Sequence, residues 1–172
     1  MELEKYIGIT EGFPKEGISF KDVSPLLGDG EVFKYTISKM AEIAEKWNPD
    51  IIVGPESRGF VFGAPLALYM GKGFVMARKK GKLPGKVISK TYTLEYNTAT
   101  IELPEFSIKK GVKVCVVDDL LATGGTLKAV EELITEMGGE VVGLLTLIEL
   151  TDLKGRDLFK KTPYESMIKF PH

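Results

Sequence analysis

The chain has 172 residues, of which 44% are hydrophobic and 27% are charged, and its formal net charge is -1. This composition is typical of a single soluble globular domain, and it excludes a disordered chain and a general attraction to nucleic acid or anionic membranes. The only histidine is the last residue and Cys115 is the only cysteine, which excludes a Ser-His-Asp triad and a His/Cys zinc cluster. We expect Cys115, within the run VCVV, to be a buried thiol without a redox role.

The apolar runs are too short to span a membrane. The longest, FVFGAPLALYMG at 60–71 and VVGLLTLI at 141–148, fall below the roughly 20 residues that a transmembrane helix needs. The sequence begins without the basic region and apolar core of a secretory signal. We therefore expect a cytoplasmic protein whose partners include neither a membrane nor nucleic acid.

The first half of the chain alternates between helical and strand patterns. Residues 32–47 place apolar side chains at helical spacing, and the helix should end at Asn48-Pro49 because a residue before proline is pushed away from helical dihedrals. Residues 51–54 then predict a short buried strand, residues 60–71 a helix, and residues 73–77 a second strand.

A glycine- and lysine-rich segment follows, RKKGKLPGKVISK at 78–90, with no acidic residue and no periodicity. We predict a long exposed loop, and loops of this length are uncommon unless they act as lids or binding segments. By composition alone a solvated surface is the simpler interpretation. The next two runs, TYTLEY at 91–96 and TATIEL at 98–103, alternate like the arms of a β-hairpin.

The second half returns to the alternation of strand and helix. KVCVV at 113–117 is a continuous apolar run typical of a parallel strand covered on both faces, residues 125–137 form an amphipathic helix stopped by two glycines, and residues 140–150 form the next strand. The whole pattern predicts an α/β protein with a doubly wound, mainly parallel sheet flanked by helices. We expect one domain over residues 1–172, with the first 30 or so residues as an appended subdomain.

The stretch VVDDLLATGGT at 116–126 carries the chemistry. It lies where a strand passes to a helix, at the edge of the sheet where open α/β folds bind ligands. A glycine-rich turn before a helix suits a phosphate, and Thr123 and Thr126 add hydroxyl donors. Asp118 and Asp119 repel phosphate but suit the vicinal hydroxyls of a sugar or a hydrated metal ion. A ribose 5-phosphate site follows, with an ordinary capped turn as the alternative.

This stretch resembles the phosphoribosyl pyrophosphate signature of the type I phosphoribosyltransferase family. Further stretches resemble the adenine-specific members of that family: FPKEGISFKDVSPLL at 13–27, ESRGFVFG at 56–63, RKKGKLPG at 78–85, YTLEY at 92–96 and ELTDLKGRDLF at 149–159. The resemblance implies a type I phosphoribosyltransferase fold with a small N-terminal hood over the base, about residues 1–30, and a flexible catalytic loop, about residues 78–96. It also implies the substrates adenine and phosphoribosyl pyrophosphate, the products AMP and pyrophosphate, Mg2+ as cofactor and a homodimer.

The resemblance also assigns roles to residues. The 5-phosphate would be bound by Ala122, Thr123, Gly124, Gly125 and Thr126, and the ribose hydroxyls by Asp118 and Asp119. Pyrophosphate would be bound by Glu56, Ser57, Arg58, Arg78, Lys79 and Lys82, and adenine by Ser19, Phe20 and Lys21. Catalytic roles fall to Glu95, as acceptor of the adenine proton, and to Arg58 and Lys79. No metal site made by the protein alone is expected, because Mg2+ would be held through the substrate, with Asp118 and Asp119 as further partners through water.

Two other functions compete with this interpretation. One is a phosphoribosyltransferase for hypoxanthine, guanine or xanthine, since the phosphate loop is shared among them. The other is a non-catalytic sensor of phosphoribosyl pyrophosphate. The chain departs from the common family pattern at Gly12, Glu56 and Asn97, which bears on the hood and on the hinge of the catalytic loop.

Overall fold

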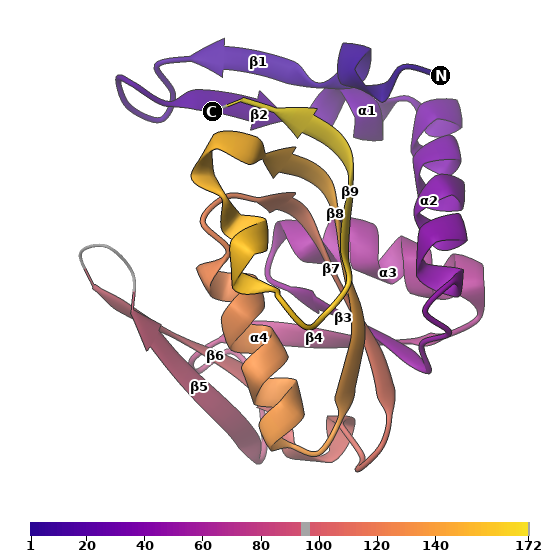
Figure 1. The fold of residues 1–172 in the computed structure, drawn as a ribbon, viewed down its shortest axis with the longest axis vertical. Helices are drawn as coiled ribbons and strands as arrows, with labels where there is room; N and C mark the ends of the chain where they lie inside the picture. The colour runs from indigo at the N-terminus through magenta and orange to yellow at the C-terminus, as the bar shows by residue number, and fades with distance from the viewer. Residues whose placement is uncertain (94–96, 172) are drawn as a thin grey trace.

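The computed structural model describes residues 1–93 and 97–171 (Figure 1). Its α-helices and strands are β1 (Gly8–Glu11), β2 (Ser19–Asp22), α1 (Ser24–Gly28), α2 (Gly30–Glu45), β3 (Ile51–Pro55), α3 (Arg58–Met70), β4 (Gly73–Lys79), β5 (Val87–Thr93), β6 (Thr98–Pro104), β7 (Lys113–Leu121), α4 (Gly125–Glu136), β8 (Glu140–Leu150) and β9 (Tyr164–Phe170). Short 3-10 helices lie at η1 (Leu3–Tyr6), η2 (Glu105–Ser107), η3 (Thr151–Leu153) and η4 (Gly155–Leu158).

The central sheet has the strand order β5-β6-β4-β3-β7-β8-β9. The five strands from β4 to β9 in this order are parallel, while β6 pairs antiparallel with both β4 and β5. The predicted doubly wound, mainly parallel sheet is therefore confirmed. β1 and β2 form a separate two-stranded sheet near the N-terminus (Figure 1).

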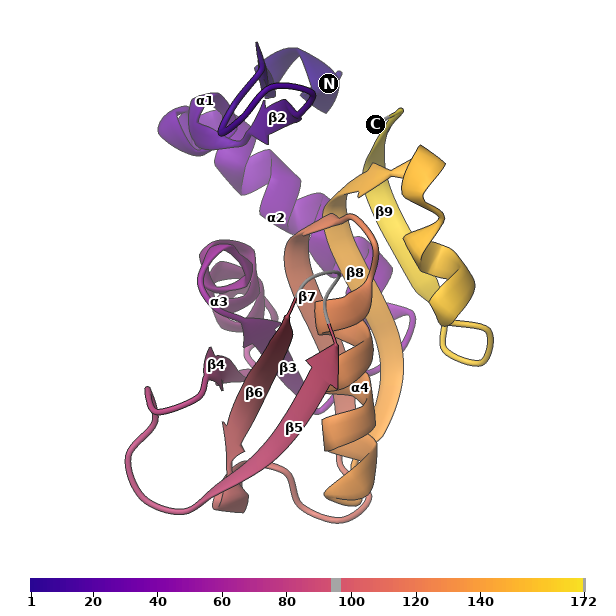
Figure 2. The same ribbon diagram turned by 90° about the vertical axis from the view of Figure 1, so that its left-hand side faces the viewer.

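Helices cover both faces of this sheet, with α2 and α3 on one side and α4 on the other (Figure 2). Alternate residues of β7 supply the two cores, because successive side chains of a strand point to opposite faces. Cys115 and Val117 pack with α2 and α3, whereas Val114 and Val116 pack with α4. Cys115 is fully buried, and burial raises the pKa of its thiol to about 12. The prediction of a buried cysteine is confirmed.

The predicted loop at 78–90 is wrong at both ends. Strand β4 continues through Arg78 and Lys79, and β5 already begins at Val87. The second boundary is set by strand pairing, because β5 pairs with β6 from Val87 opposite Pro104 to Thr93 opposite Thr98. Lys90, counted as part of the loop, instead forms ion pairs with Glu132 and Glu136 on α4. The segment without regular structure is limited to residues 80–86.

Two other boundaries and one strand differ from prediction. Helix α2 starts earlier, at Gly30, because the carboxylate of Asp29 accepts hydrogen bonds from the amides of Glu31 and Val32. Helix α3 starts at Arg58 rather than at 60. Strand β9, parallel to β8, was not predicted, because its sequence YESMIKF has a weak apolar pattern.

No helix within residues 1–93 and 97–171 combines the length and the apolar character needed to cross a membrane.

The contact between Gly143 and Trp47 offers a test of the packing. A Cβ atom built on Gly143 of β8 would lie 2.0 Å from Cε3 of Trp47, just after α2. We expect Gly143→Ala to lower the free energy of unfolding by about 1–3 kcal/mol through overpacking. Trp47 is the only tryptophan, so urea unfolding followed by its fluorescence reports the change directly.

Gly30→Ala is the matched control, because a Cβ at Gly30 would meet nothing within 4 Å. It should leave stability unchanged or slightly raised. Equal midpoints for the two variants would contradict the packing argument.

Candidate active site at the switch point of the sheet

The site lies between β3 and β7, where the chain direction diverges. After β3 the chain returns to β4 on one side, and after β7 it returns to β8 on the other. The pairing of β3 with β7 runs from Ile51 opposite Val114 to Val53 opposite Val116. Beyond that point β3 continues beside β4 and β7 continues beside β8. Diverging strands leave a crevice at the carboxyl edge of the sheet, which is the usual ligand site of such folds.

A cavity of about 400 Å³ occupies this crevice. Its lining comes from the segments that follow the two strands and from the end of β4: Glu56, Ser57, Arg58, Lys79, Asp118, Asp119, Leu120, Leu121, Ala122, Thr123, Gly124, Gly125, Thr126 and Leu127. The structure therefore brings together both aspartates and the whole segment predicted to bind the 5-phosphate, residues 122–126, which we call the phosphate segment. Four of the six residues predicted to bind pyrophosphate also line this cavity: Glu56, Ser57, Arg58 and Lys79.

The phosphate segment is a short turn leading into α4. Gly124 has a φ of +90°, a conformation that favours glycine, and it places Gly125 at the start of the helix. Among the described residues no side chain caps this helix. The first amides of α4 and the positive end of its dipole are therefore available to an anion.

The acidic pair lies inside β7 rather than in the turn, which corrects the predicted end of that strand at residue 117. Strand β7 runs on to Leu121, because Asp118 pairs with Thr146 and Leu121 with Glu149 of β8. Strand pairing thus holds the two aspartates in place, and both line the cavity.

The two aspartates differ in their surroundings. Asp119 is only 3% exposed, and its Oδ2 lies 3.0 Å from Nε of Arg58. Asp118 Oδ1 accepts a hydrogen bond of 2.8 Å from the Asp119 amide. Burial, and then the neighbouring charge of Asp119, raise the pKa of Asp118 well above its usual range. The cavity floor therefore carries one paired carboxylate and one that is unfavourable to ionise.

The loop after β3 forms the opposite wall. The peptide bond between Glu56 and Ser57 is cis. Gly59, in the first turn of α3, packs so closely that a Cβ there would lie 2.8 Å from Cδ of Pro55 and 3.1 Å from Oδ1 of Asp118. Glycine at this position lets the start of α3 reach the acidic pair.

The basic residues predicted for pyrophosphate are placed unequally. Arg58 and Lys79 line the cavity. Arg78 instead donates a hydrogen bond of 3.2 Å from Nε to Oε1 of Glu56. The same oxygen accepts a second hydrogen bond, of 2.7 Å, from the amide of Lys79. Lys82 is exposed on the loop between β4 and β5. Glu95 lies outside the described residues.

The N-terminal subdomain reaches the site through Phe20. Its ring lies 5.8 Å from the guanidinium carbon of Arg58 and packs edge-on against Phe13 at 5.2 Å. Lys21 is buried, and its Nζ donates 2.7 Å to Ser19 Oγ. Ser19, Phe20 and Lys21 thus form one segment of β2 next to the cavity wall that carries Arg58.

Two contacts of the phosphate segment were missed from the sequence. The hydroxyl of Tyr92 on β5 lies 3.1 Å from Oγ1 of Thr126. Gly155 packs directly on the turn, since a Cβ there would lie 2.4 Å from the carbonyl oxygen of Ala122. Both residues belong to stretches quoted for the family resemblance, YTLEY and ELTDLKGRDLF, but nothing local in the sequence predicts these long-range contacts.

The donor set around the cavity suits a hydrated cation rather than a fully protein-bound one. Within the described part of the chain, no group of three or more His, Cys, Asp or Glu side chains could hold a metal ion. Asp118 and Asp119 nevertheless present carboxylate oxygens to the cavity. These are suitable partners for a Mg2+ ion that keeps several waters.

Comparisons with known proteins agree with this geometry. Residues 29–171 match the phosphoribosyl transferase domain family. An adenine phosphoribosyltransferase of Clostridium botulinum (strain Eklund 17B / Type B) is 57% identical over 157 residues, which cover 91% of each chain.

Two solved structures have the same fold. The adenine phosphoribosyltransferase of Thermoanaerobacter pseudethanolicus is 45% identical with a TM-score of 0.95, over 98% of each chain. That of Saccharomyces cerevisiae, in complex with adenine and D-2,5-dideoxy-2,5-imino-altritol 1,6-bisphosphate, is 37% identical with a TM-score of 0.91, over 96% of each chain. The chain belongs to the phosphoribosyltransferase family, and within it to the adenine phosphoribosyltransferases.

The raised pKa of Asp118 leads to a prediction about stability. An acid whose folded pKa lies above its unfolded value stabilises the fold at low pH, and this contribution is lost as the pH rises through the folded pKa. Asp118→Asn removes the charge and keeps an acceptor for the Asp119 amide. At pH 8 we expect its unfolding free energy to exceed that of the wild type by on the order of 1 kcal/mol. Thermal unfolding from pH 3.5 to pH 8 measures the difference.

The gain should disappear below the unfolded pKa of an aspartate, about 3.9. Asp157→Asn, at an exposed aspartate, should show no such pH-dependent gain. A stability difference for Asp118→Asn that stays constant with pH would contradict the assignment.

Proposed function

We propose that the chain transfers the 5-phosphoribosyl group of phosphoribosyl pyrophosphate to adenine, giving AMP and pyrophosphate in purine salvage. One observation carries the proposal: a glycine-rich turn at the start of α4, two aspartates and the cations Arg58 and Lys79 line a single cavity of about 400 Å³. These groups match the parts of the substrate in order, namely its 5-phosphate, its ribose hydroxyls and its pyrophosphate. The adenine in the complex of the yeast relative supports the choice of base.

We assign the 5-phosphate to the segment from Ala122 to Thr126, at the start of α4. The ribose hydroxyls would donate to Asp118 and Asp119. Asp119 is now paired with Arg58 at 3.0 Å, so binding would exchange partners: Asp119 accepts from the sugar and Arg58 turns to the pyrophosphate. An exchange of this kind keeps the buried carboxylate of Asp119 supplied with donors in both states.

The pyrophosphate would lie against Glu56, Ser57, Arg58 and Lys79. Arg78 and Lys82 would join when the loop at 80–86 closes over the site and excludes water. Mg2+ bound with the substrate would spread the charge of the leaving pyrophosphate. We expect Asp118 and Asp119 to contact its waters rather than the ion itself.

Adenine would stack on Phe20, with backbone groups near Ser19 and Lys21 meeting its edge. The ring nitrogen of adenine forms a bond to C1′ of the ribose as the bond from C1′ to pyrophosphate breaks. That nitrogen must lose its proton, and we assign the proton to the carboxylate of Glu95. This role rests on the family resemblance of YTLEY.

The proposal is tested by pyrophosphate release from phosphoribosyl pyrophosphate with Mg2+, with adenine, hypoxanthine, guanine and xanthine offered separately. We expect release with adenine, and rates at least about a hundredfold lower with the 6-oxopurines, because a polar base edge that finds no partner is costly to bury. Release with another base would retain the phosphate assignments and reject those of Ser19, Phe20 and Lys21. Binding without release from any base would indicate a sensor.

The same assay tests Glu95. Glu95→Gln should lower turnover by about 10²–10⁴-fold, the usual share of general acid–base catalysis, and should leave the affinity for phosphoribosyl pyrophosphate unchanged. Unchanged turnover would remove Glu95 from the mechanism.

We also propose that the chain forms a homodimer through the outer surfaces of α2 and α3. Leu68 is 83% exposed and Tyr69 54% exposed, and both line an apolar groove with Phe33, Ile37 and Pro65. Exposed apolar surface of this kind marks an interaction site. Leu68→Glu should convert a dimer into a monomer in sedimentation velocity, whereas a wild type that sediments as a monomer at micromolar concentration would contradict the dimer.

A cytoplasmic location belongs to the same proposal. Phosphoribosyl pyrophosphate carries several negative charges and cannot cross a bilayer unaided, so the enzyme must work in the compartment where this substrate is made.

A further inference from the structure

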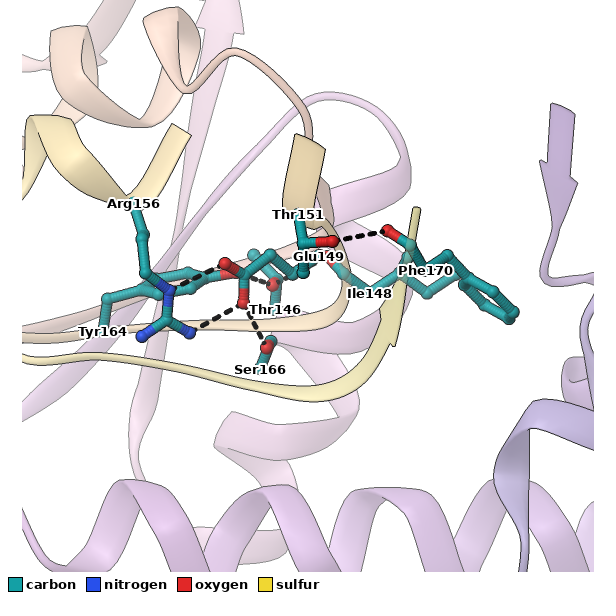
Figure 3. Close-up of polar contacts among 8 residues, drawn as sticks. All are labelled: Thr146, Ile148, Glu149, Thr151, Arg156, Tyr164, Ser166 and Phe170. Carbon is teal, nitrogen blue, oxygen red and sulfur yellow. Dashed lines mark hydrogen bonds and ion pairs between the residues drawn. The ribbon is translucent and has the colours of Figure 1, made fainter. Parts of the chain in front are cut away.

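A polar cluster with a buried carboxylate lies outside the lining of the cavity. It joins the end of β8 to η4 and β9 and is centred on Glu149 (Figure 3). Glu149 is only 4% exposed, and its carboxylate accepts from Nε and Nη2 of Arg156, both at 2.7 Å. Ser166 Oγ adds a third donor at 2.7 Å. A buried carboxylate needs such donors, because without them its desolvation is not compensated.

Arg156 is held in place from a second direction. Its guanidinium carbon lies 5.0 Å from the centre of the Tyr164 ring, so the planar group stacks over β9 (Figure 3). The Tyr164 hydroxyl is 2.6 Å from Oγ1 of Thr146. Thr146 donates its own proton to the carbonyl of Ile148 at 3.0 Å, so Tyr164 must be the donor to Thr146. Both the carboxylate and the guanidinium are therefore locked by neighbours on two strands.

This cluster touches the phosphate segment through the residue before Arg156. Gly155 is buried, and a Cβ there would lie 2.4 Å from the carbonyl oxygen of Ala122. In the other direction, a Cβ on Gly124 would lie 3.1 Å from the carbonyl oxygen of Gly155 and 3.1 Å from Cδ1 of Leu158. The turn at 155–158 and the turn at 122–124 thus pack backbone against backbone. A shift of Gly155 should move Ala122, because the nearest neighbour of Gly155 across this contact is a backbone carbonyl and not the end of a flexible side chain.

From this chain of contacts we infer that Glu149 and Arg156 are positioning residues for the 5-phosphate site: their ion pair holds Gly155 against the phosphate segment and so sets the direction of its backbone amides. Neither residue lines the cavity, so the inferred effect runs through Gly155 rather than through contact with the substrate. The inference rests on the proposed function and extends it to a second layer of the same site. Binding sites tolerate errors of only about 0.5 Å in their donors, which is why such support matters.

The adenine side of the site should be unaffected. Ser19 and Phe20 lie on β2 in the N-terminal part of the chain, and Phe20 contacts the cavity wall through Arg58. A loss of positioning should therefore weaken binding of the phosphate group and spare binding of the base. General destabilisation would weaken both.

The test uses Arg156→Lys, Arg156→Ala and Gly155→Ala in the full chain. Arg156→Lys keeps the charge but loses the paired geometry, and Gly155→Ala pushes on Ala122 without removing the ion pair. We expect each to raise the Kd for ribose 5-phosphate, by calorimetry, and the KM for phosphoribosyl pyrophosphate by about tenfold or more. The KM for adenine should stay within about twofold of the wild type. Arg156→Lys should lie between the wild type and Arg156→Ala.

Two controls make the result specific. Lys39→Met removes a surface ion pair with Glu42, and Gly73→Ala adds a Cβ whose nearest neighbour would be Cγ2 of Ile51 at 3.7 Å, an ordinary contact distance; neither should change either constant. If Arg156→Ala does not fold, Arg156→Lys and Gly155→Ala decide the matter. Unchanged affinity for ribose 5-phosphate in these folded variants, or an equal loss for adenine and phosphate, would overturn the inference. A wild type that binds neither ribose 5-phosphate nor AMP would overturn the proposed function with it.

Discussion

The site depends on how far β3 and β7 remain paired. Their register ends at Val53 and Val116, after which each strand continues beside a different neighbour. Hydrogen bonding within the sheet thus supports both strands while leaving an opening between their ends. The Glu56–Arg58 segment and the Ala122–Thr126 segment enter this opening from its two sides. A longer pairing of β3 with β7 would have closed the cavity between these two segments.

The charges in the opening follow from the same geometry. Two adjacent carboxylates at the end of a buried strand are unfavourable for the fold, and the raised pKa of Asp118 reflects this. Arg58 compensates Asp119 in the absence of substrate. The protein accepts this electrostatic cost at the place where a sugar diol can supply hydrogen-bond donors. Strained or poorly compensated groups of this kind are concentrated at functional sites.

The ion pair of Glu149 and Arg156 shows the opposite arrangement, in which the charges are paired. Glu149 and Arg156 are fully paired, hydrogen-bonded and stacked, and Arg156 holds the Glu149 carboxyl at a pKa below its usual range. A satisfied buried network is rigid, whereas a partly satisfied one is not. A carboxyl that is unfavourable to ionise, that of Asp118, therefore lines the cavity, whereas Glu149 and Arg156, which are paired with each other, lie outside its lining.

Local patterns in the sequence were enough for the order of most strands and helices in the α/β chain and for placing the glycine-rich turn and the acidic pair at the carboxyl edge of the sheet. These features depend on short-range physics: side-chain periodicity, glycine in a left-handed turn and the dipole of a helix start. The same patterns misplaced the ends of the basic segment, since Val87–Thr93 becomes a strand by pairing with β6 and Lys90 finds its acids on α4. Tertiary structure alone decided which residues meet across the fold: Tyr92 with Thr126, Arg58 with Asp119 and Gly155 with Ala122. Such contacts join segments far apart in the chain, and no local periodicity encodes them.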